Sequence, residues 1–126
     1  MVGPHKAIVI SSLQHRRQSL AALLRSMPDI GEIHECENME CLEINLYFHP
    51  SIILFDCWLD DKLTTDLVKP MRRQFPAAKC LALVKQNSLV NYPLVDAALV
   101  EGFTVDQFFQ TIRGLIKNSK TLLSAA

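Results

Sequence analysis

A short apolar run that ends on a carboxylate is the feature that most constrains this chain: Ser51-Ile52-Ile53-Leu54-Phe55-Asp56. A continuous apolar run of this length is typical of a strand buried on both faces, as at the centre of a parallel sheet. The carboxyl ends of such strands form the edge at which open α/β folds place their sites. We therefore expect Asp56 to lie where a functional carboxylate would lie.

The rest of the chain alternates between strand patterns and helix patterns. Apolar or alternating runs predict four more strands, and apolar residues at helical spacing predict the helices between them; the strands are expected at residues 7–10, 30–35, 80–84 and 94–100. Ser11 or Ser12 is expected to cap the first helix and Thr104 the last. The last helix should bury one stripe of side chains, namely Val105, Phe108, Phe109, Ile112, Leu115 and Ile116. Residues 85–93 are few and turn-rich, so the fourth helix is expected to be shortened or missing.

This alternation, without tight hairpin signals, predicts an α/β fold: a doubly wound, five-stranded parallel sheet with helices on both faces. A length of 126 residues suits one compact domain, and no repeat or low-complexity segment divides it. We expect a single domain over residues 1–126, with a core at about 6–118 and a tail or the start of a linker at 119–126.

Composition argues against several classes of partner. Thirteen basic and thirteen acidic residues cancel, so no net field attracts nucleic acid or an acidic membrane surface. No apolar run approaches the ~20 residues that span a bilayer, and the N-terminus lacks a signal-peptide pattern. Direct nucleic-acid binding and membrane insertion are therefore not expected. We expect a cytoplasmic location.

The four cysteines are expected to be buried, reduced thiols. They form no CxxC pair and have no zinc-like spacing with the four histidines. Several lie inside apolar runs, where a thiol behaves as a small hydrophobic group. The cysteines are Cys36, Cys41, Cys57 and Cys80. No metal or other cofactor site is predicted from them.

Taken together, the five-strand alternation and the lone aspartate that ends the third strand resemble the receiver domain of two-component response regulators. The resemblance to these chemotaxis-regulator-like domains covers about residues 6–118. Within the family, the chain is most similar to receivers of helix-turn-helix transcriptional regulators. It is carried by Ala22-Leu23-Leu24-x-x-Met27-Pro28-Asp29-Ile30, Ile52-Ile53-Leu54-Phe55-Asp56, Arg72-Arg73-Gln74-Phe75-Pro76 and Phe108-Phe109-Gln110-Thr111-Ile112-Arg113. It implies a flavodoxin-like fold, with Asp56 at the position that accepts a phosphoryl group from a histidine kinase.

The resemblance breaks at the metal site. Receiver domains place two acidic residues after the first strand, and these hold the Mg²⁺ that phosphorylation requires. The matching residues here are Ser11 and Ser12. Mg²⁺ prefers charged oxygen ligands in an octahedral array, so we expect binding to be weak or absent. Asp60 and Asp61 could supply a displaced cation site or could simply be solvated.

It breaks again around the phosphoryl group. The family's hydroxyl residue after the fourth strand is replaced by Val84, its lysine after the fifth strand by Glu101, and its aromatic switch residue by Ala98. Glu101 would repel a phosphorylated Asp56. It either enters the pocket, where the two carboxylates would share a proton or hydrogen-bond through a serine, or faces water. Lys85 could fold back to restore a positive charge or remain solvated.

Three functions follow from this pattern. The first is a pseudo-receiver that signals without normal Asp phosphorylation, by contact with a protein partner or fused output domain, with a homodimer as a further option. The alternative is a divergent but working phosphoacceptor that controls a DNA-binding output domain. An enzyme of another class is disfavoured, because the chain has no glycine-rich phosphate loop, GxSxG elbow or nucleophile–base pair. Apolar residues without an expected place in the core, Phe103, Leu122 and Leu123, mark the surface predicted to contact a partner.

Overall fold

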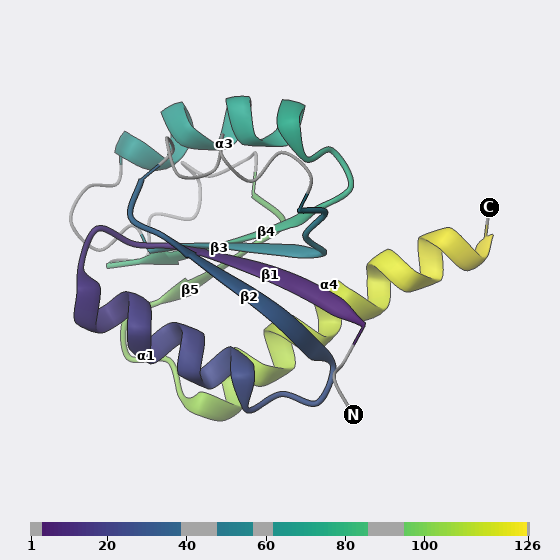
Figure 1. Cartoon of the computed structure of the whole chain (residues 1–126), viewed down its shortest axis with the longest axis horizontal. Helices are drawn as coiled ribbons and strands as arrows, with labels where there is room; N and C mark the ends of the chain where they lie inside the picture. Colours follow the sequence, from purple (N-terminus) through teal and green to yellow (C-terminus); the bar gives the residue numbers. More distant parts are fainter. Residues whose placement is uncertain (1–3, 39–47, 57–61, 86–94, 126) are drawn as a thin grey trace.

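A computed structural model describes residues 4–38, 48–56, 62–85 and 95–125 of the chain (Figure 1). Five strands and three helices lie within these ranges. They are β1 (His5–Ile10), α1 (Gln14–Arg25), β2 (Ile30–Cys36), β3 (Ile52–Asp56), α3 (Lys62–Gln74), β4 (Lys79–Val84), β5 (Ala97–Val100) and α4 (Val105–Ala125). The expected shortened fourth helix falls almost entirely outside the described residues.

The strands form one sheet in the order β2-β1-β3-β4-β5, and every neighbouring pair is parallel. This is the doubly wound, flavodoxin-like arrangement, which confirms the predicted fold class. The chain order reverses between β1 and β3, which are direct neighbours. In such sheets this switch point opens a crevice at the carboxyl ends of the strands.

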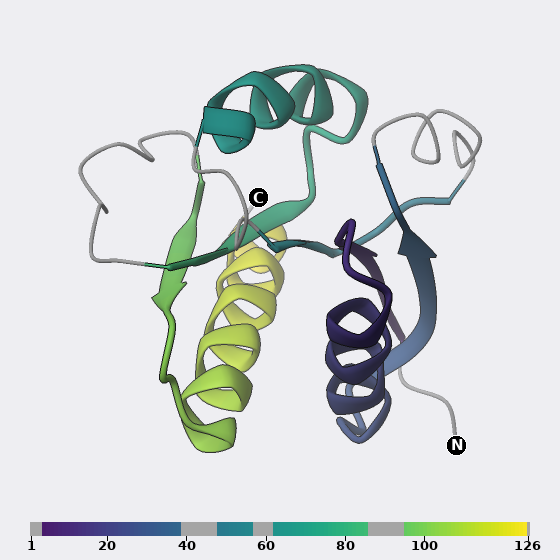
Figure 2. The ribbon, with the colours of Figure 1, turned by 90° about the vertical axis from the view of Figure 1, so that its left-hand side faces the viewer.

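Helices cover both faces of the sheet. Figure 2 shows α3 on one side and α1 with α4 on the other. Because successive side chains of a strand point to opposite faces, β3 contributes Ile53 and Phe55 to the core under α3. Its other residues, Ile52 and Leu54, pack under α1 and α4. The strand is thus buried on both faces, as its continuous apolar run predicts.

The two predicted helix starts have different outcomes. Thr104 caps α4: its hydroxyl accepts a hydrogen bond from the Gln107 amide (3.0 Å), and the Gln107 side chain accepts one from the Thr104 amide (2.8 Å). This reciprocal capping box confirms the prediction. The prediction for α1 is wrong, because its cap position is Leu13 and no side chain bonds there. Ser11 instead accepts the Leu13 amide (3.2 Å) in a turn before the helix.

The stripe of side chains predicted to be buried on α4 is confirmed except at its first residue. Phe108, Ile112 and their successors at helical spacing are buried, whereas Val105 is 50% exposed. Phe103, which had no expected place in the core, packs against the cluster under α1 and α4. The backbone of α4 remains helical to Ala125 and extends away from the sheet at its carboxyl end (Figure 1). Among the described residues, no helix combines the length and the apolar character needed to span a membrane.

Candidate functional site

The switch point brings two predicted site residues together. β1 and β3 are paired in register with Ile10 opposite Phe55, so the next residues, Ser11 and Asp56, emerge side by side. The Ser11 hydroxyl donates a hydrogen bond of 2.8 Å to Asp56 Oδ2. Both groups are withdrawn from solvent: Ser11 is 2% exposed and the Asp56 side chain 1%. The carboxylate therefore needs internal partners.

Its main partner is Arg16, in the first turn of α1. Arg16 Nε donates to Asp56 Oδ2 (2.6 Å) and Arg16 Nη2 donates to Asp56 Oδ1 (2.9 Å). This two-pronged geometry matches the planar guanidinium to the planar carboxylate, which is the strongest form of a protein ion pair. Within the described residues, Ser11 and Arg16 are the side-chain partners of Asp56. Both carboxylate oxygens are thus occupied by the protein itself.

Arg17, the next residue, connects the loop after β1 to strand β2. Its Nη1 donates to the Ser11 carbonyl (2.8 Å), and its Nε lies 3.7 Å from Glu35 on β2. Glu35 also pairs with Arg25 at the end of α1. Successive arginines therefore fix α1 and the loop after β1 relative to the sheet edge.

The other predicted site residues do not reach Asp56. Ser12 is exposed, and Glu101 is exposed with no hydrogen bond or ion pair from its carboxylate to another described residue. The cluster joining Asp56 to Glu101 through a serine therefore does not form. Lys85 is exposed and is not a partner of Asp56. Asp60 and Asp61 lie outside the described residues.

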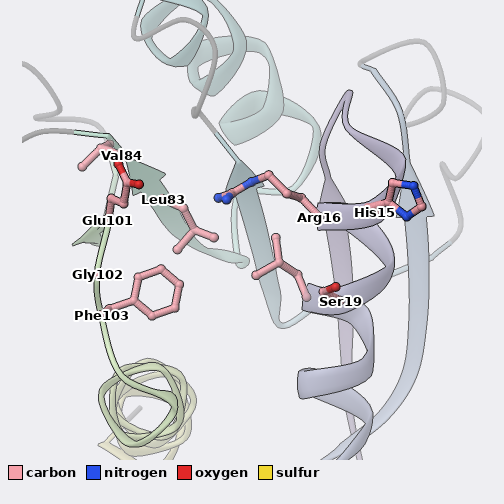
Figure 3. Close-up of a pocket in the computed structure, with 9 residues that line it drawn as sticks. His15, Arg16, Ser19, Leu83, Val84, Glu101, Gly102 and Phe103 are labelled. Atoms are coloured by element: carbon pink, nitrogen blue, oxygen red, sulfur yellow. The ribbon is translucent and has the colours of Figure 1, made fainter.

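A pocket of about 400 Å³ adjoins the ion pair. Figure 3 shows Arg16 reaching from α1 and Glu101 standing on the opposite wall at the end of β5. Leu83, Val84 and Phe103 line the space between them. Val84 and Glu101, which replace the hydroxyl residue and the lysine of receiver domains, therefore both border the pocket. Ala98, which replaces the aromatic switch residue, is partly buried against the core under α3.

The Mg²⁺ implied by the fold does not suit this donor set. Among the described residues, no group of three or more His, Cys, Asp or Glu side chains could hold a metal ion. Of the described residues, Asp56 alone places a buried carboxylate at the switch point. Its oxygens accept hydrogen bonds from Arg16 and Ser11. Ser11 and Ser12 add only neutral hydroxyls. A cation would have to displace a guanidinium to coordinate Asp56.

Arg16 was missed at the level of sequence, although a signal was present. Helix dipoles favour acidic residues in the first turn and disfavour cations there. α1 begins Gln14-His15-Arg16-Arg17 and has no acidic residue in its first turn. Paired arginines at the unfavourable end of a helix, directly after a strand, indicate carboxylate partners nearby. Only the neighbouring strand ends could show which carboxylates.

Comparison with known proteins supports the fold. The chain matches no protein-family model, and no curated protein matches it by sequence. Solved structures do match. The signal receiver domain of an HD domain-containing protein from Pseudomonas fluorescens is 13% identical, with a TM-score of 0.79, 97% of this chain and 93% of that one being covered.

Two further structures agree. A response regulator receiver modulated diguanylate cyclase from Pelobacter carbinolicus is 19% identical, with a TM-score of 0.73 and coverages of 95% of this chain and 98% of that one. A DNA-binding response regulator of the LuxR family from Staphylococcus aureus is 14% identical, with a TM-score of 0.71 and coverages of 89% and 98%. At these identities the likeness establishes the fold, which is that of response regulator receiver domains.

Proposed function

We propose that this chain is a pseudo-receiver: a receiver-fold signalling module that acts through contact with a protein partner or output domain, with Asp56 locked by Arg16 instead of phosphorylated. The observation that carries the proposal is the two-pronged ion pair between Arg16 and Asp56, with both oxygens of the carboxylate bonded. Fold alone would not decide between a working and a silent receiver.

The ion pair opposes phosphoryl transfer at the nucleophile. To attack phosphorus, an oxygen of Asp56 must release the hydrogen bonds that now hold it, and breaking a buried pair leaves an uncompensated charge. The permanent guanidinium also takes the place that a divalent cation would need. A charge that Mg²⁺ would supply reversibly is thus supplied by the chain itself.

The surroundings oppose the phosphorylated product as well. A phosphoryl group on Asp56 would meet Val84, which offers no hydrogen-bond donor, where receivers carry a hydroxyl. Glu101 on the facing wall would add a negative charge where receivers carry a lysine. Val84 and Glu101 therefore give a phosphoryl group on Asp56 no favourable contact.

Titration with beryllofluoride and Mg²⁺, followed by amide NMR, tests the proposal. We expect no saturable change at millimolar Mg²⁺ in the wild type and an identical result for Asp56→Asn. Acetyl phosphate should likewise leave the intact mass unchanged. A saturable change that Asp56→Asn abolishes would overturn the proposal and favour a divergent phosphoacceptor.

A restored variant provides the matched positive control. It combines Ser11→Asp, Ser12→Asp, Arg16→Met, Val84→Thr and Glu101→Lys, and so returns the receiver-type residues to their positions. We expect this variant, once its fold is verified by circular dichroism, to bind beryllofluoride where the wild type does not. A second variant with the other four substitutions but with Arg16 retained should bind more weakly if Arg16 is the lock.

A further inference from the structure

The pocket between α1 and the end of β5 has the dimensions and lining of a small-molecule site. Its volume of about 400 Å³ lies within the range of ligand pockets. It lies at the carboxyl edge of the sheet, where doubly wound folds bind ligands. Figure 3 shows Arg16 on one wall, Glu101 and Phe103 on the opposite wall, and Leu83 between them. Such a lining suits a ligand with an apolar body and one polar head.

The apolar part of the lining is contributed by three separate segments. Leu20 on α1 is 6% exposed, and Leu83 on β4 is 2% exposed. Phe103 follows β5 and is half-buried, with its ring 6.0 Å from that of Phe108. These side chains are held by the core beneath them, so the apolar wall is preformed. An aromatic or branched aliphatic group can lie against it without reordering the fold.

The charge of the pocket selects the head group. The positive charge of Arg16 is matched by Asp56 in the ion pair, so these two contribute no net charge. Glu101 is the other charged residue of the lining when histidine is counted as neutral, and its carboxylate has no ion-pair partner among the described residues. Taken together, the Arg16–Asp56 pair and the described residues that line the pocket therefore carry a net negative charge. Electrostatic complementarity favours a cation, which the ring of Phe103 can also attract through its face.

We infer that this pocket binds a small organic cation, a protonated amine on an apolar or aromatic stem, with Glu101 pairing with the ammonium and Leu20, Leu83 and Phe103 holding the stem. The inference rests on the proposed function only in that the Arg16–Asp56 pair neutralises the opposite wall. It adds a ligand class to a site that the loss of phosphorylation chemistry leaves open. Val84 and Glu101, which oppose phosphoryl binding, are well suited to this alternative ligand.

Three probes of similar size and different charge test the inference. Phenethylamine, phenethyl alcohol and phenylacetate are titrated into the full chain at neutral pH and followed by NMR of the backbone amides and leucine methyls. We expect the amine to bind with a dissociation constant on the order of 1 mM, as suits so small a ligand. The affected signals should be those of Gly102, Phe103, Leu20 and Leu83. The alcohol should bind about twofold to fivefold more weakly, and phenylacetate more weakly still.

Two charge-matched variants locate the effect. Glu101→Gln removes the carboxylate and should reduce the affinity for the amine to that for the alcohol. Asp29→Asn removes the same charge at an exposed turn away from the pocket and should leave the preference for the amine unchanged. Both positions are exposed, so neither variant is expected to disturb folding.

The inference is overturned if phenylacetate binds as tightly as the amine, or if the shifts fall outside the pocket. It is also overturned if Glu101→Gln keeps the preference for the amine. These outcomes are independent of phosphorylation: saturable beryllofluoride binding with intact amine binding would overturn the proposed function alone. Loss of amine binding with a silent Asp56 would overturn the pocket alone.

Discussion

Arg16 shows how one residue can take over the charge balance of a site. It lies in the first turn of α1, where the helix dipole is unfavourable to a cation, and its side chain is still 32% exposed. The buried carboxylate of Asp56 offsets that penalty, because a fully withdrawn charge requires a hydrogen-bonded partner. The ion pair thus offsets both the helix-dipole penalty on Arg16 and the desolvation penalty on Asp56.

The pair gives a direct prediction at the residue scale. Arg16→Met keeps the length of the side chain but leaves Asp56 buried with Ser11 as its one side-chain partner among the described residues, so we expect the free energy of unfolding to fall by about 3 kcal/mol. Adding Asp56→Asn removes the orphaned charge and should recover most of that loss. Urea denaturation of the two single variants and the double variant gives the coupling energy.

A second arginine on the same helix serves as the control. Arg25 is 56% exposed and pairs with Glu35 at 3.3 Å, so Arg25→Met should change stability by less than about 1 kcal/mol. Equal losses for Arg16→Met and Arg25→Met would contradict the view that Asp56 depends on Arg16.

At the scale of elements, one carboxylate links α3, β4 and the segment just before β5. Asp96, just before β5, accepts hydrogen bonds from the Cys80 amide (2.7 Å) and from Arg72 Nη2 on α3 (2.8 Å). The Asp96 amide in turn donates to the Cys80 carbonyl (3.0 Å). A helix, a central strand and the edge strand therefore meet at Cys80. This compensates for the brevity of β5, which has four residues.

Burial at this junction gives a pH prediction. Cys80 is 1% exposed, and desolvation raises the pKa of its thiol from the ordinary 9.0 to about 11. Between these values the unfolded chain releases the proton while the folded chain keeps it. The thiol's contribution to stability is therefore full below about pH 9 and is lost as the pH rises through about 11.

Comparison with Cys80→Ala isolates this contribution from other groups that titrate in alkali. The free energy of unfolding of the wild type relative to Cys80→Ala should fall by up to about 2 to 3 kcal/mol between about pH 8 and pH 11. Chemical denaturation at each pH measures it. A difference that stays constant across this range would show that the thiol is not desolvated.

The predicted state of the cysteines is confirmed where the structure describes them. Cys36 and Cys80 are both buried and free of disulfides. Cys41 and Cys57 lie outside the described residues. Residues of this kind act as small core side chains rather than as reactive groups.

At the scale of the whole molecule, stability depends on two cores that share one sheet. The core under α1 and α4 contains Phe108, which is fully buried and is among the largest such side chains. The core under α3 has Phe55 as its counterpart. Because both use alternate residues of the same strands, loss of either should unfold the domain as one unit.

Truncation of Phe108 tests this cooperativity. Phe108→Ala should lower the free energy of unfolding by about 3 to 5 kcal/mol, a large share of the roughly 5–15 kcal/mol typical of a domain. Val105→Ala, one turn earlier on the same stripe but half exposed, should change it by less than about 0.5 kcal/mol. Coincident far- and near-ultraviolet circular dichroism transitions would indicate a single unit; separate transitions in Phe108→Ala would contradict it.

The sequence by itself determined the architecture and the central position of Asp56. Apolar continuity in 52–55, alternation of strand and helix patterns, and the cap at Thr104 are local signals, and the parallel sheet follows from them because covered strands must be apolar on both faces. The exceptions within the fold, the cap of α1 and the exposure of Val105, depended on what neighbouring elements offered each residue.

Only the tertiary structure decided what Asp56 is bonded to. Arg16 is 40 residues away in the chain, and nothing in its local sequence specifies which carboxylate it meets. Pairing of β1 with β3 brings the end of β3 beneath the first turn of α1, and the distance between guanidinium and carboxylate follows from that crossing. The order of the strands also sets Glu101, which follows β5, across a pocket from Arg16, although the two residues are far apart in the chain. Patterns along a chain report burial, whereas the partners of a charge depend on which strand ends the sheet brings together.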